Sequence, residues 1–464
     1  MSSVYADPAV RRRLTEFLGG DELEHATAVY ITNSDRCQFD LRELRAPLEL
    51  DYYLTNELDI ARSLADSSSI LLHLDIEYVN FDSPAEAYLD PLRTFALQEP
   101  VVRVILALLR QWGIHPLHLL TGQGHHFVWR IARTSATAIH LLELCPAPEL
   151  LESCAQRVPQ GHTQIINDEA HRTFAAISLL MEFLAHRIRE LASPLTEIPV
   201  EITAVHVGCS TTKQREIISI DISEYGDPLH TRMVRMPFTR YLKPWLSGLA
   251  HSLGIEKRIP RFLAIPLHQM DTKLALQLRQ VEKQVCDLAQ RTCMQIPQCE
   301  TGTQALLNEY LGSPLRQFHK YFYSDQHDAK ASWHETYDRT PMAVLPPCAR
   351  HVVMWPNDIL LKPAGMQLIT RCLQAAKWHP RHIAGFIRSK FENPVFHWGV
   401  NWAAYVPAIR ADFYTRLFAG LYATGHDPLI DFNCTSTREK GFCFSCAPNE
   451  QKTLGPIRQI LLPS

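Results

Sequence analysis

The sequence predicts an α+β fold in which short strands alternate with helices before a mainly helical end. Residues 68–80 and 117–130 contain apolar runs typical of buried strands, and the second run is broken by a glycine-rich turn. Residues 100–113 and 168–191 place apolar side chains at helical spacing, which indicates helices with broad buried faces. Strands interleaved with helices in this way favour a half-buried sheet that helices cover.

The elements follow in order along the chain. Residues 1–55 read as mixed helix and loop, and strand character returns over residues 201–222 and 231–241. Together with the segments above, they predict a first domain over residues 1–264.

Helical patterns dominate the rest of the chain. Residues 265–340 predict a polar helical connector, with LALQLRQVEKQVCDLAQ as its clearest helix. Glycine, proline and aromatic residues then increase, and helices are expected over residues 366–377 and 381–390. These features predict a second domain over residues 341–464.

Composition limits the class of protein. A length of 464 residues allows two or three domains with sizeable cores, and no apolar run approaches the length of a membrane span. The N-terminus lacks the apolar segment of a signal peptide, so we expect a cytoplasmic protein without a membrane partner. The net charge of −3 gives no global signature of nucleic-acid binding, so any such binding must come from local patches. In a reducing compartment, the 12 cysteines indicate metal or cluster ligation, or buried thiols, rather than disulfides.

Two carboxylates interrupt the first apolar strand. Asp75 and Glu77 lie two positions apart in LLHLDIEYV, so both side chains emerge on one face of the strand. Burying two carboxylates together is costly unless a cation meets them. A pair of divalent metal ions is the natural partner.

Three later segments supply the other parts of a reaction centre. TGQGHHFVW carries His125 and His126 after two glycines that allow a close backbone approach to a ligand. EIISID ends in a third carboxylate, Asp221. TRMVRMPFTRYLK is basic, with Arg232, Arg235, Arg240 and Lys243. Metals on one side and phosphate-binding cations on the other suit phosphoryl transfer from a nucleoside triphosphate.

The order of these motifs resembles the archaeo-eukaryotic primase superfamily, the primase-polymerases. The resemblance rests on Asp75, Glu77, Thr121, Gly122, Gly124, His126, Asp221, Arg235, Pro237, Phe238 and Lys243. The sequence departs from the family pattern at Glu77, where aspartate is commoner, and at Thr121, where serine is usual. The resemblance implies that Asp75, Glu77 and Asp221 hold two Mg²⁺ or Mn²⁺ ions. It also implies that Thr121, Gly122, Gly124, His126, Arg235 and Lys243 bind the nucleotide.

Four cysteines near the C-terminus form a second candidate site. They are Cys348, Cys434, Cys443 and Cys446, and the last two form a C-x-x-C pair. Thiolate ligation fits either zinc or an iron–sulfur cluster, and spacing does not choose between them. This segment resembles the C-terminal domain of the primase large subunit, which implies a [4Fe–4S] cluster and a primer or template contact through Arg381 and Lys390. Cys372 is expected to be a buried thiol.

Simpler interpretations compete with each site. Asp75 and Glu77 could lie on an exposed strand edge, His126 could be a core histidine, and the basic strand could be a solvated face. His125 should point away from His126 and serve the structure. Cys145, Cys154 and His162 offer only three zinc ligands, with Cys209 far away in sequence, so we expect no zinc there. The basic run 11–13 is expected to be an exposed helix face.

The expected function is therefore a DNA-dependent primase-polymerase that makes primers de novo on single-stranded template. Its partners would be the template, nucleoside triphosphates, and a helicase or another replication, repair or defence protein. Two alternatives stay open: a metal-dependent nuclease, which needs no triphosphate cradle, and a non-catalytic nucleic-acid sensor or defence component with a primase fold.

Overall fold

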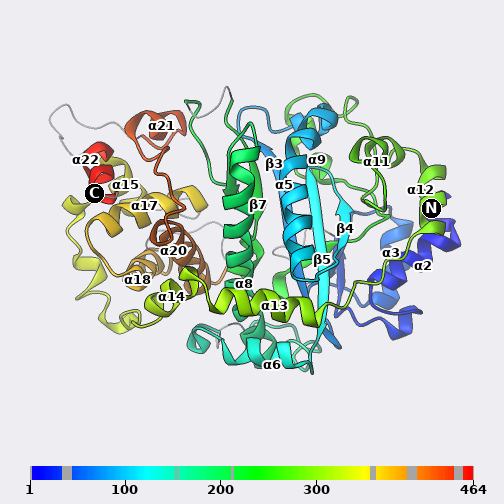
Figure 1. Cartoon of the computed structure of the whole chain (residues 1–464), viewed down its shortest axis with the longest axis horizontal. Helices are drawn as coiled ribbons and strands as arrows, with labels where there is room; N and C mark the ends of the chain where they lie inside the picture. The colour runs from blue at the N-terminus through cyan, green and yellow to red at the C-terminus, as the bar shows by residue number, and fades with distance from the viewer. Residues whose placement is uncertain are drawn as a thin grey trace.

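The computed structural model describes residues 3–33, 44–151, 154, 156–210, 214–355, 362–393, 395, 405–443 and 453–462. The predicted α+β fold is confirmed: a mixed sheet occupies the middle of the molecule, and helices flank it and form one end (Figure 1). The chain begins at the end opposite to the C-terminal helices.

The central sheet has six strands in the order β6-β7-β3-β5-β4-β9. Their bounds are Val200–Ile202, Glu216–Asp221, Ser69–Asn80, Gly124–Ala132, Leu117–Leu120 and Ile265–Pro266. Only β6 and β7 pair in parallel, and all other neighbours are antiparallel. The twelve-residue β3 lies between β7 and β5, so the strand that carries the first two carboxylates is an inner strand.

Alternation along β3 separates an apolar face from a polar face. Leu74, Ile76 and Tyr78 are buried, whereas Asp75 and Glu77 between them are partly exposed on the other face. Helices α5 (Pro91–Gln111) and α8 (Asp168–Ala192) pack against each other and cover the apolar face. A side chain caps the start of each helix: Asp90 accepts a hydrogen bond from the backbone N–H of Arg93, and Asn167 accepts one from the backbone N–H of Ala170.

A small second sheet lies across the polar face. It has the order β1-β2-β8, with bounds Ile31–Asn33, Ile60–Ser63 and Met233–Arg235. The strand expected over residues 231–241 is therefore only three residues long. Pro237 offers no backbone N–H to a ladder, and Phe238 adopts a left-handed φ of 61°, so the chain leaves the strand there. The strand expected over residues 201–222 is likewise divided into β6 and β7.

Helices account for most of the remaining chain. They include α11 (Thr272–Leu278), α12 (Glu282–Arg291), α13 (Glu300–Leu311), α14 (Pro314–Phe322), α15 (Pro347–Met354), α17 (Pro363–Ala375), α18 (Pro380–Phe391) and α20 (Pro407–Ala423). Helices α17, α18 and α20 gather at one end of the molecule (Figure 1). Their core is continuous with the core of the sheet region, from Val4 to Leu461.

Buried charges join the helical end to α8. Glu182 of α8 is fully buried and accepts a hydrogen bond from Nε of Arg416 on α20 at 2.8 Å. His319 of α14 lies 3.2 Å from the other oxygen of the same carboxylate. The ion pair therefore fixes α8, α14 and α20 relative to one another.

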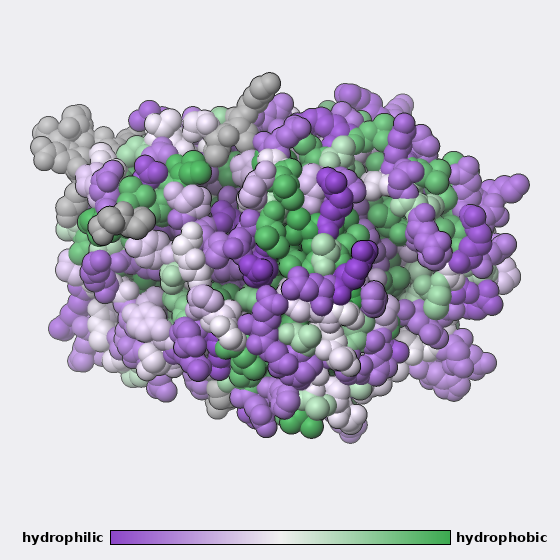
Figure 2. Space-filling model, in the orientation of Figure 1, coloured by the Kyte–Doolittle hydropathy of each residue, from purple (hydrophilic) through white to green (hydrophobic). Residues whose placement is uncertain are grey.

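The surface is mostly polar on the face shown in Figure 2, with an apolar patch near its centre. An apolar groove of about 510 Å³ lies between α5 and residues 267–276. Of the helices that the structure describes, none combines the length and the apolar character that crossing a bilayer requires.

Candidate active site

Strand register brings the predicted catalytic residues side by side. Asp75 of β3 is directly opposite Asp221 of β7 on one side and His126 of β5 on the other. Directly opposite residues of antiparallel strands point to the same face of the sheet. Two carboxylates that lie 146 positions apart in the chain thus meet on neighbouring strands.

These residues form the floor of a polar cleft of about 220 Å³ beneath β8, here called the acidic cleft. Its lining residues are His73, Asp75, Glu77, His126, Asp221, Ser223, Glu224, Thr231, Arg232, Met233, Arg235 and Lys243. The cleft therefore contains three predicted carboxylates, the predicted histidine and three of the four cations of the predicted basic segment.

Asp75 is poorly neutralised in this cleft. Its side chain is 15% exposed, and its Oδ2 lies 3.3 Å from Nε2 of His126. Its Oδ1 is buried and has no hydrogen-bond partner in the part of the chain that the structure describes. Burial raises the pKa of Asp75 to about 7, and the neighbouring Asp221 acts in the same direction. Burial also lowers the pKa of His126, which keeps its imidazole neutral.

Glu77 faces Lys243 across the cleft. Nζ of Lys243 lies 3.7 Å from Oε1 of Glu77, and the two side chains are 39% and 22% exposed. Burial raises the pKa of Glu77 even though Lys243 acts against that change. The Glu77 carboxylate in turn raises the pKa of Lys243, so the amine is charged.

Arg235 is held rigidly at the same end of the cleft. Its Nε donates to Oδ1 of Asp59 at 2.8 Å, and its Nη2 donates to Oδ2 at 3.1 Å. Its guanidinium carbon stands 4.2 Å from the centre of the Tyr241 ring. Asp59 is fully buried and also accepts from the backbone N–H of Leu242. The fork geometry presents a pre-oriented cation to the cleft.

Arg240 lies outside the cleft and has a different role. It pairs with Glu57 at 3.1 Å and with Glu282 at 3.0 Å, and it does not line the cleft. Of the four cations in the basic segment, Arg232, Arg235 and Lys243 therefore line the cleft and Arg240 fastens α12.

The glycine-rich turn does not provide room for a ligand. A Cβ on Gly124 would lie 1.7 Å from the carbonyl oxygen of Ile76, and one on Gly122 would lie 2.2 Å from the Tyr241 ring. Thr121 is buried and its hydroxyl bonds the carbonyl of Gly124 at 3.1 Å. The expectation that these glycines admit a ligand is corrected here, because neighbouring protein atoms fill the space. In this structure, the three residues position His126.

His125 points away from the cleft, as expected. It is fully buried, its ring lies 5.3 Å from that of Phe95 on α5, and its Nδ1 lies 2.9 Å from Nε2 of His118. It belongs to the interface between sheet and helix.

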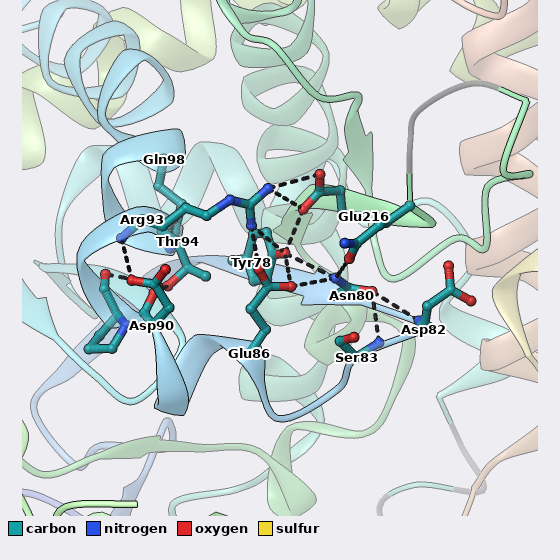
Figure 3. Close-up of polar contacts among 12 residues, drawn as sticks. Tyr78, Asn80, Asp82, Ser83, Glu86, Asp90, Arg93, Thr94, Gln98 and Glu216 are labelled. Carbon is teal, nitrogen blue, oxygen red and sulfur yellow. Dashed lines mark hydrogen bonds and ion pairs between the residues drawn. The ribbon is translucent and has the colours of Figure 1, made fainter.

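A polar network fixes the far end of β3. Arg93 of α5 contacts Glu86 at 2.6 Å and Glu216 of β7 at 3.0 Å, and the hydroxyl of Tyr78 donates to Glu216 at 2.6 Å (Figure 3). Asn80 joins the same cluster through Glu86. A one-residue slip of β3 against β7 would turn the carboxylates into the core, and this network resists it.

Sequence reasoning missed three contributors to the cleft. His73 lies two positions before Asp75 on the same strand face, so alternation alone could have identified it. Glu224 follows Asp221 by three residues and folds back to His73, with 2.9 Å between Nδ1 and each carboxylate oxygen. Asp59 carries no sequence signal, because its partner Arg235 is 176 residues away.

Comparison of the chain with known protein families, curated proteins and solved structures finds no match.

The fit of these residues to metal ions rests on Asp75 and Asp221. A buried carboxylate oxygen without a donor, next to a second carboxylate, is a place that a divalent cation would satisfy. Within the described ranges, no three His, Cys, Asp or Glu side chains converge on one point. Glu77 is turned toward Lys243 here, so it would have to leave that contact to serve as a ligand.

The C-terminal cysteines receive less support. Cys348 on α15 is 7% exposed and lies near the buried thiol of Cys372, whose pKa is raised by burial and then by Cys348. Cys434 begins α21 (Cys434–Glu439), Cys443 follows that helix, and Cys446 lies outside the described residues. The three described candidates do not form a ligand group, so the cluster stays a prediction.

The basic residues expected to contact the primer are already paired. Arg381 is 2% exposed and forms ion pairs with Asp412 and, at 3.4 Å, with Glu149. Lys390 is 8% exposed and donates to Asp338 at 2.8 Å. This geometry corrects the expectation of cations available to a primer and favours a structural role within the helical end.

The small cysteine and histidine group near residue 150 likewise forms no metal site among the described residues. Cys154 is buried, Cys145 is partly buried, and the ring of His162 stacks on Tyr30 at 6.0 Å.

Proposed function

We propose that this protein is a DNA-dependent primase-polymerase, a nucleotidyltransferase that starts primers on single-stranded template. The observation that carries the proposal is the register of Asp75 between Asp221 and His126 in a cleft whose opposite wall bears Arg235 and Lys243. Carboxylates for metal ions and cations for a polyphosphate are the two requirements of this reaction.

The chain's own residues would divide the work as follows. Asp75, Asp221 and, after leaving Lys243, Glu77 would hold two Mg²⁺ or Mn²⁺ ions. When bound, such ions supply activation of the attacking hydroxyl and neutralisation of the leaving pyrophosphate. Arg235, held by Asp59, and Lys243 would bind the β- and γ-phosphates.

The reaction balances as a single displacement. The 3′-oxygen of one nucleotide forms a bond to the α-phosphorus of the next, and the bond from that phosphorus to pyrophosphate breaks. The hydroxyl proton leaves to solvent. His126 lies beside Asp75 and, being neutral, can donate one hydrogen bond to a phosphate oxygen.

The pre-oriented Arg235 separates this proposal from a nuclease. A nuclease could use the same carboxylates but needs no cation fixed at the far end of the cleft. The ion pair to a fully buried Asp59 is a costly way to hold one arginine, which supports a ligand for it.

The deciding experiment measures incorporation of labelled NTPs or dNTPs on unprimed single-stranded DNA with Mg²⁺ or Mn²⁺. We expect Asp221→Asn to abolish products. Arg235→Gln should raise the KM for nucleotide at least tenfold, whereas the matched control Arg240→Gln, from the same segment but outside the cleft, should leave it unchanged. Degradation of the template without incorporation would favour the nuclease, and neither activity would favour a non-catalytic binding protein.

The cysteine centre, [4Fe–4S] or Zn²⁺, is kept as a separate proposal, and no step above depends on it. Analysis of iron, zinc and sulfide in protein purified without air tests it. The template, nucleoside triphosphates and a helicase or other replication, repair or defence protein are the proposed partners.

A further inference from the structure

His73 lies in the acidic cleft but has no part in the roles above. Its Nδ1 is 2.9 Å from both carboxylate oxygens of Glu224. The hydroxyl of Tyr225 lies 3.1 Å from the backbone nitrogen of His73 and donates to its carbonyl at 2.8 Å. Glu224 therefore fixes the imidazole, and Tyr225 fixes the backbone that carries it.

The other ring nitrogen of His73 is unsatisfied. Its side chain is 4% exposed, and Nε2 is buried without a hydrogen-bond partner in the described part of the chain. Buried polar atoms are nearly always paired, so an exception inside a cleft points to a ligand. The ring of His126 stands beside it, with 4.7 Å between ring centroids.

The position of His73 defines the kind of ligand. Along β3, Glu77 faces Lys243 at one end of the cleft, Asp75 and Asp221 lie in the middle, and His73 lies at the other end. In an in-line displacement, the attacking and leaving oxygens lie on opposite sides of the phosphorus. If the pyrophosphate leaves toward Lys243, the attacking hydroxyl approaches from the side of His73.

We infer that His73 binds, through Nε2, the 3′-hydroxyl of the nucleotide that attacks, so that this end of the cleft is the acceptor subsite. The inference rests on the proposed function. A hydroxyl both donates and accepts, so it can pair with Nε2 whether or not that nitrogen carries a proton. His126 stands beside this nitrogen and contacts Asp75 at 3.3 Å.

Two substitutions separate the two ring nitrogens. His73→Asn places an amide near the position of Nδ1 and keeps a partner for Glu224, but it leaves nothing at Nε2. His73→Gln reaches the position of Nε2 and gives up the contact with Glu224. The readout is equilibrium binding of a primer–template that ends in a 3′-hydroxyl, compared with one that ends in a 3′-deoxy sugar, in Mn²⁺ without nucleotide.

The wild-type protein should prefer the 3′-hydroxyl primer by roughly 2- to 10-fold, the range of one net hydrogen bond. His73→Asn should lose this preference, and His73→Gln should keep part of it. The affinity of His73→Asn for a non-hydrolysable nucleoside triphosphate should be unchanged, which would show that the cleft of this variant is intact. The same affinity should fall in Lys243→Ala, which would show that the assay detects a lost contact. If His73→Asn does not fold, Glu224→Gln takes its place and should reduce the preference.

The inference alone would be overturned by a wild-type protein that incorporates nucleotides but binds both primers equally, or by a His73→Asn protein that keeps the full preference. Loss of triphosphate binding in folded His73→Asn would also overturn it, because it would assign His73 to the nucleotide. A wild-type protein that incorporates no nucleotide would overturn the proposed function and the inference together.

Discussion

Replacing Asp75 by asparagine should make the metal-free protein more stable while removing its response to divalent cations. Asparagine has nearly the same shape but never carries the charge that burial penalises at this position. The Oδ1 of Asp75 already lacks a hydrogen-bond partner among the described residues, so the substitution breaks no bond at that atom. The gain should appear only where the wild-type carboxyl would otherwise be ionised.

The magnitude follows from the pKa of Asp75, which burial raises from 3.8 to about 7. A shift of about three units corresponds to about 4 kcal/mol at about 1.4 kcal/mol per unit, as an upper limit. Because the side chain is 15% exposed, solvent screens part of this cost, and about 2 kcal/mol is expected.

The difference in the free energy of unfolding between Asp75→Asn and the wild type depends on pH. At a pH well below 3.8 the carboxyl is protonated in both folded and unfolded states, so wild type and variant should be alike. As the pH rises from 4 to 7, the unfolded chain releases its proton before the folded protein does. The free energy of unfolding of the wild type therefore falls relative to that of Asp75→Asn, and the difference levels off above pH 8.

Urea denaturation followed by tryptophan fluorescence, in EDTA at pH 5 and pH 8, measures this difference. Addition of Mn²⁺ at pH 8 should then stabilise the wild type but not Asp75→Asn. Asp287→Asn, at an exposed carboxylate on α12, is the matched control and should change neither quantity. The reasoning fails if Asp75→Asn is no more stable than the wild type at pH 8 in EDTA, or if its advantage does not grow with pH.

Three further predictions concern the framework of the cleft. Burial alone would raise the pKa of Glu182, but Arg416 and His319 outweigh burial and lower the pKa to about 2. The stability that this ion pair contributes is therefore present above pH 4.5 and is lost as the pH falls toward 2. Glu182→Gln should therefore cost up to about 3 kcal/mol at pH 6 and progressively less in acid, as measured by urea denaturation across that range. Gly124→Ala should destabilise the protein by about 1–3 kcal/mol or more, because the added Cβ would lie 1.7 Å from the backbone oxygen of Ile76 on β3. Unchanged thermal stability of this variant would contradict that contact. Arg93→Met should lower the free energy of unfolding by about 1–3 kcal/mol, because Glu216 of β7 stays buried without its ion pair. An unchanged free energy in urea denaturation would show that the hydrogen bond from Tyr78 alone stabilises this carboxylate.

The local features of the site could be predicted from sequence. Alternation in LLHLDIEYV fixes which side chains of β3 share a face, and the structure places Asp75 and Glu77 there. The long helices expected at residues 100–113 and 168–191 are present as α5 and α8 because their apolar periodicity extends over several turns. Such local patterns do not depend on how distant parts of the chain pair.

The non-local features could not be predicted from spacing alone. The strand order that sets Asp221 opposite Asp75 depends on which of several apolar strands pair, and no local signal specifies it. The bidentate anchoring of Arg235 by Asp59 depends on a carboxylate without any motif. Gly122, Gly124 and Arg381 show the opposite error, because their residue types suggest a ligand site that the structure does not provide. Neighbouring protein atoms fill the space beside the two glycines, and Asp412 pairs with Arg381.

The balance of charge in the acidic cleft explains how these features act together. Among the described residues, Arg232, Arg235 and Lys243 line the cleft, but Asp227 and Asp59 already neutralise the two arginines at 2.7 and 2.8 Å. Of the four carboxylates of the lining, Glu77 faces Lys243 and Glu224 faces His73, which leaves Asp75 and Asp221 without a paired cation among these residues. A triphosphate would be repelled from this surface, whereas two divalent cations would reverse its sign. If the proposed function is correct, cations would enter before or with the nucleotide, and the two arginines would orient the phosphates rather than attract them.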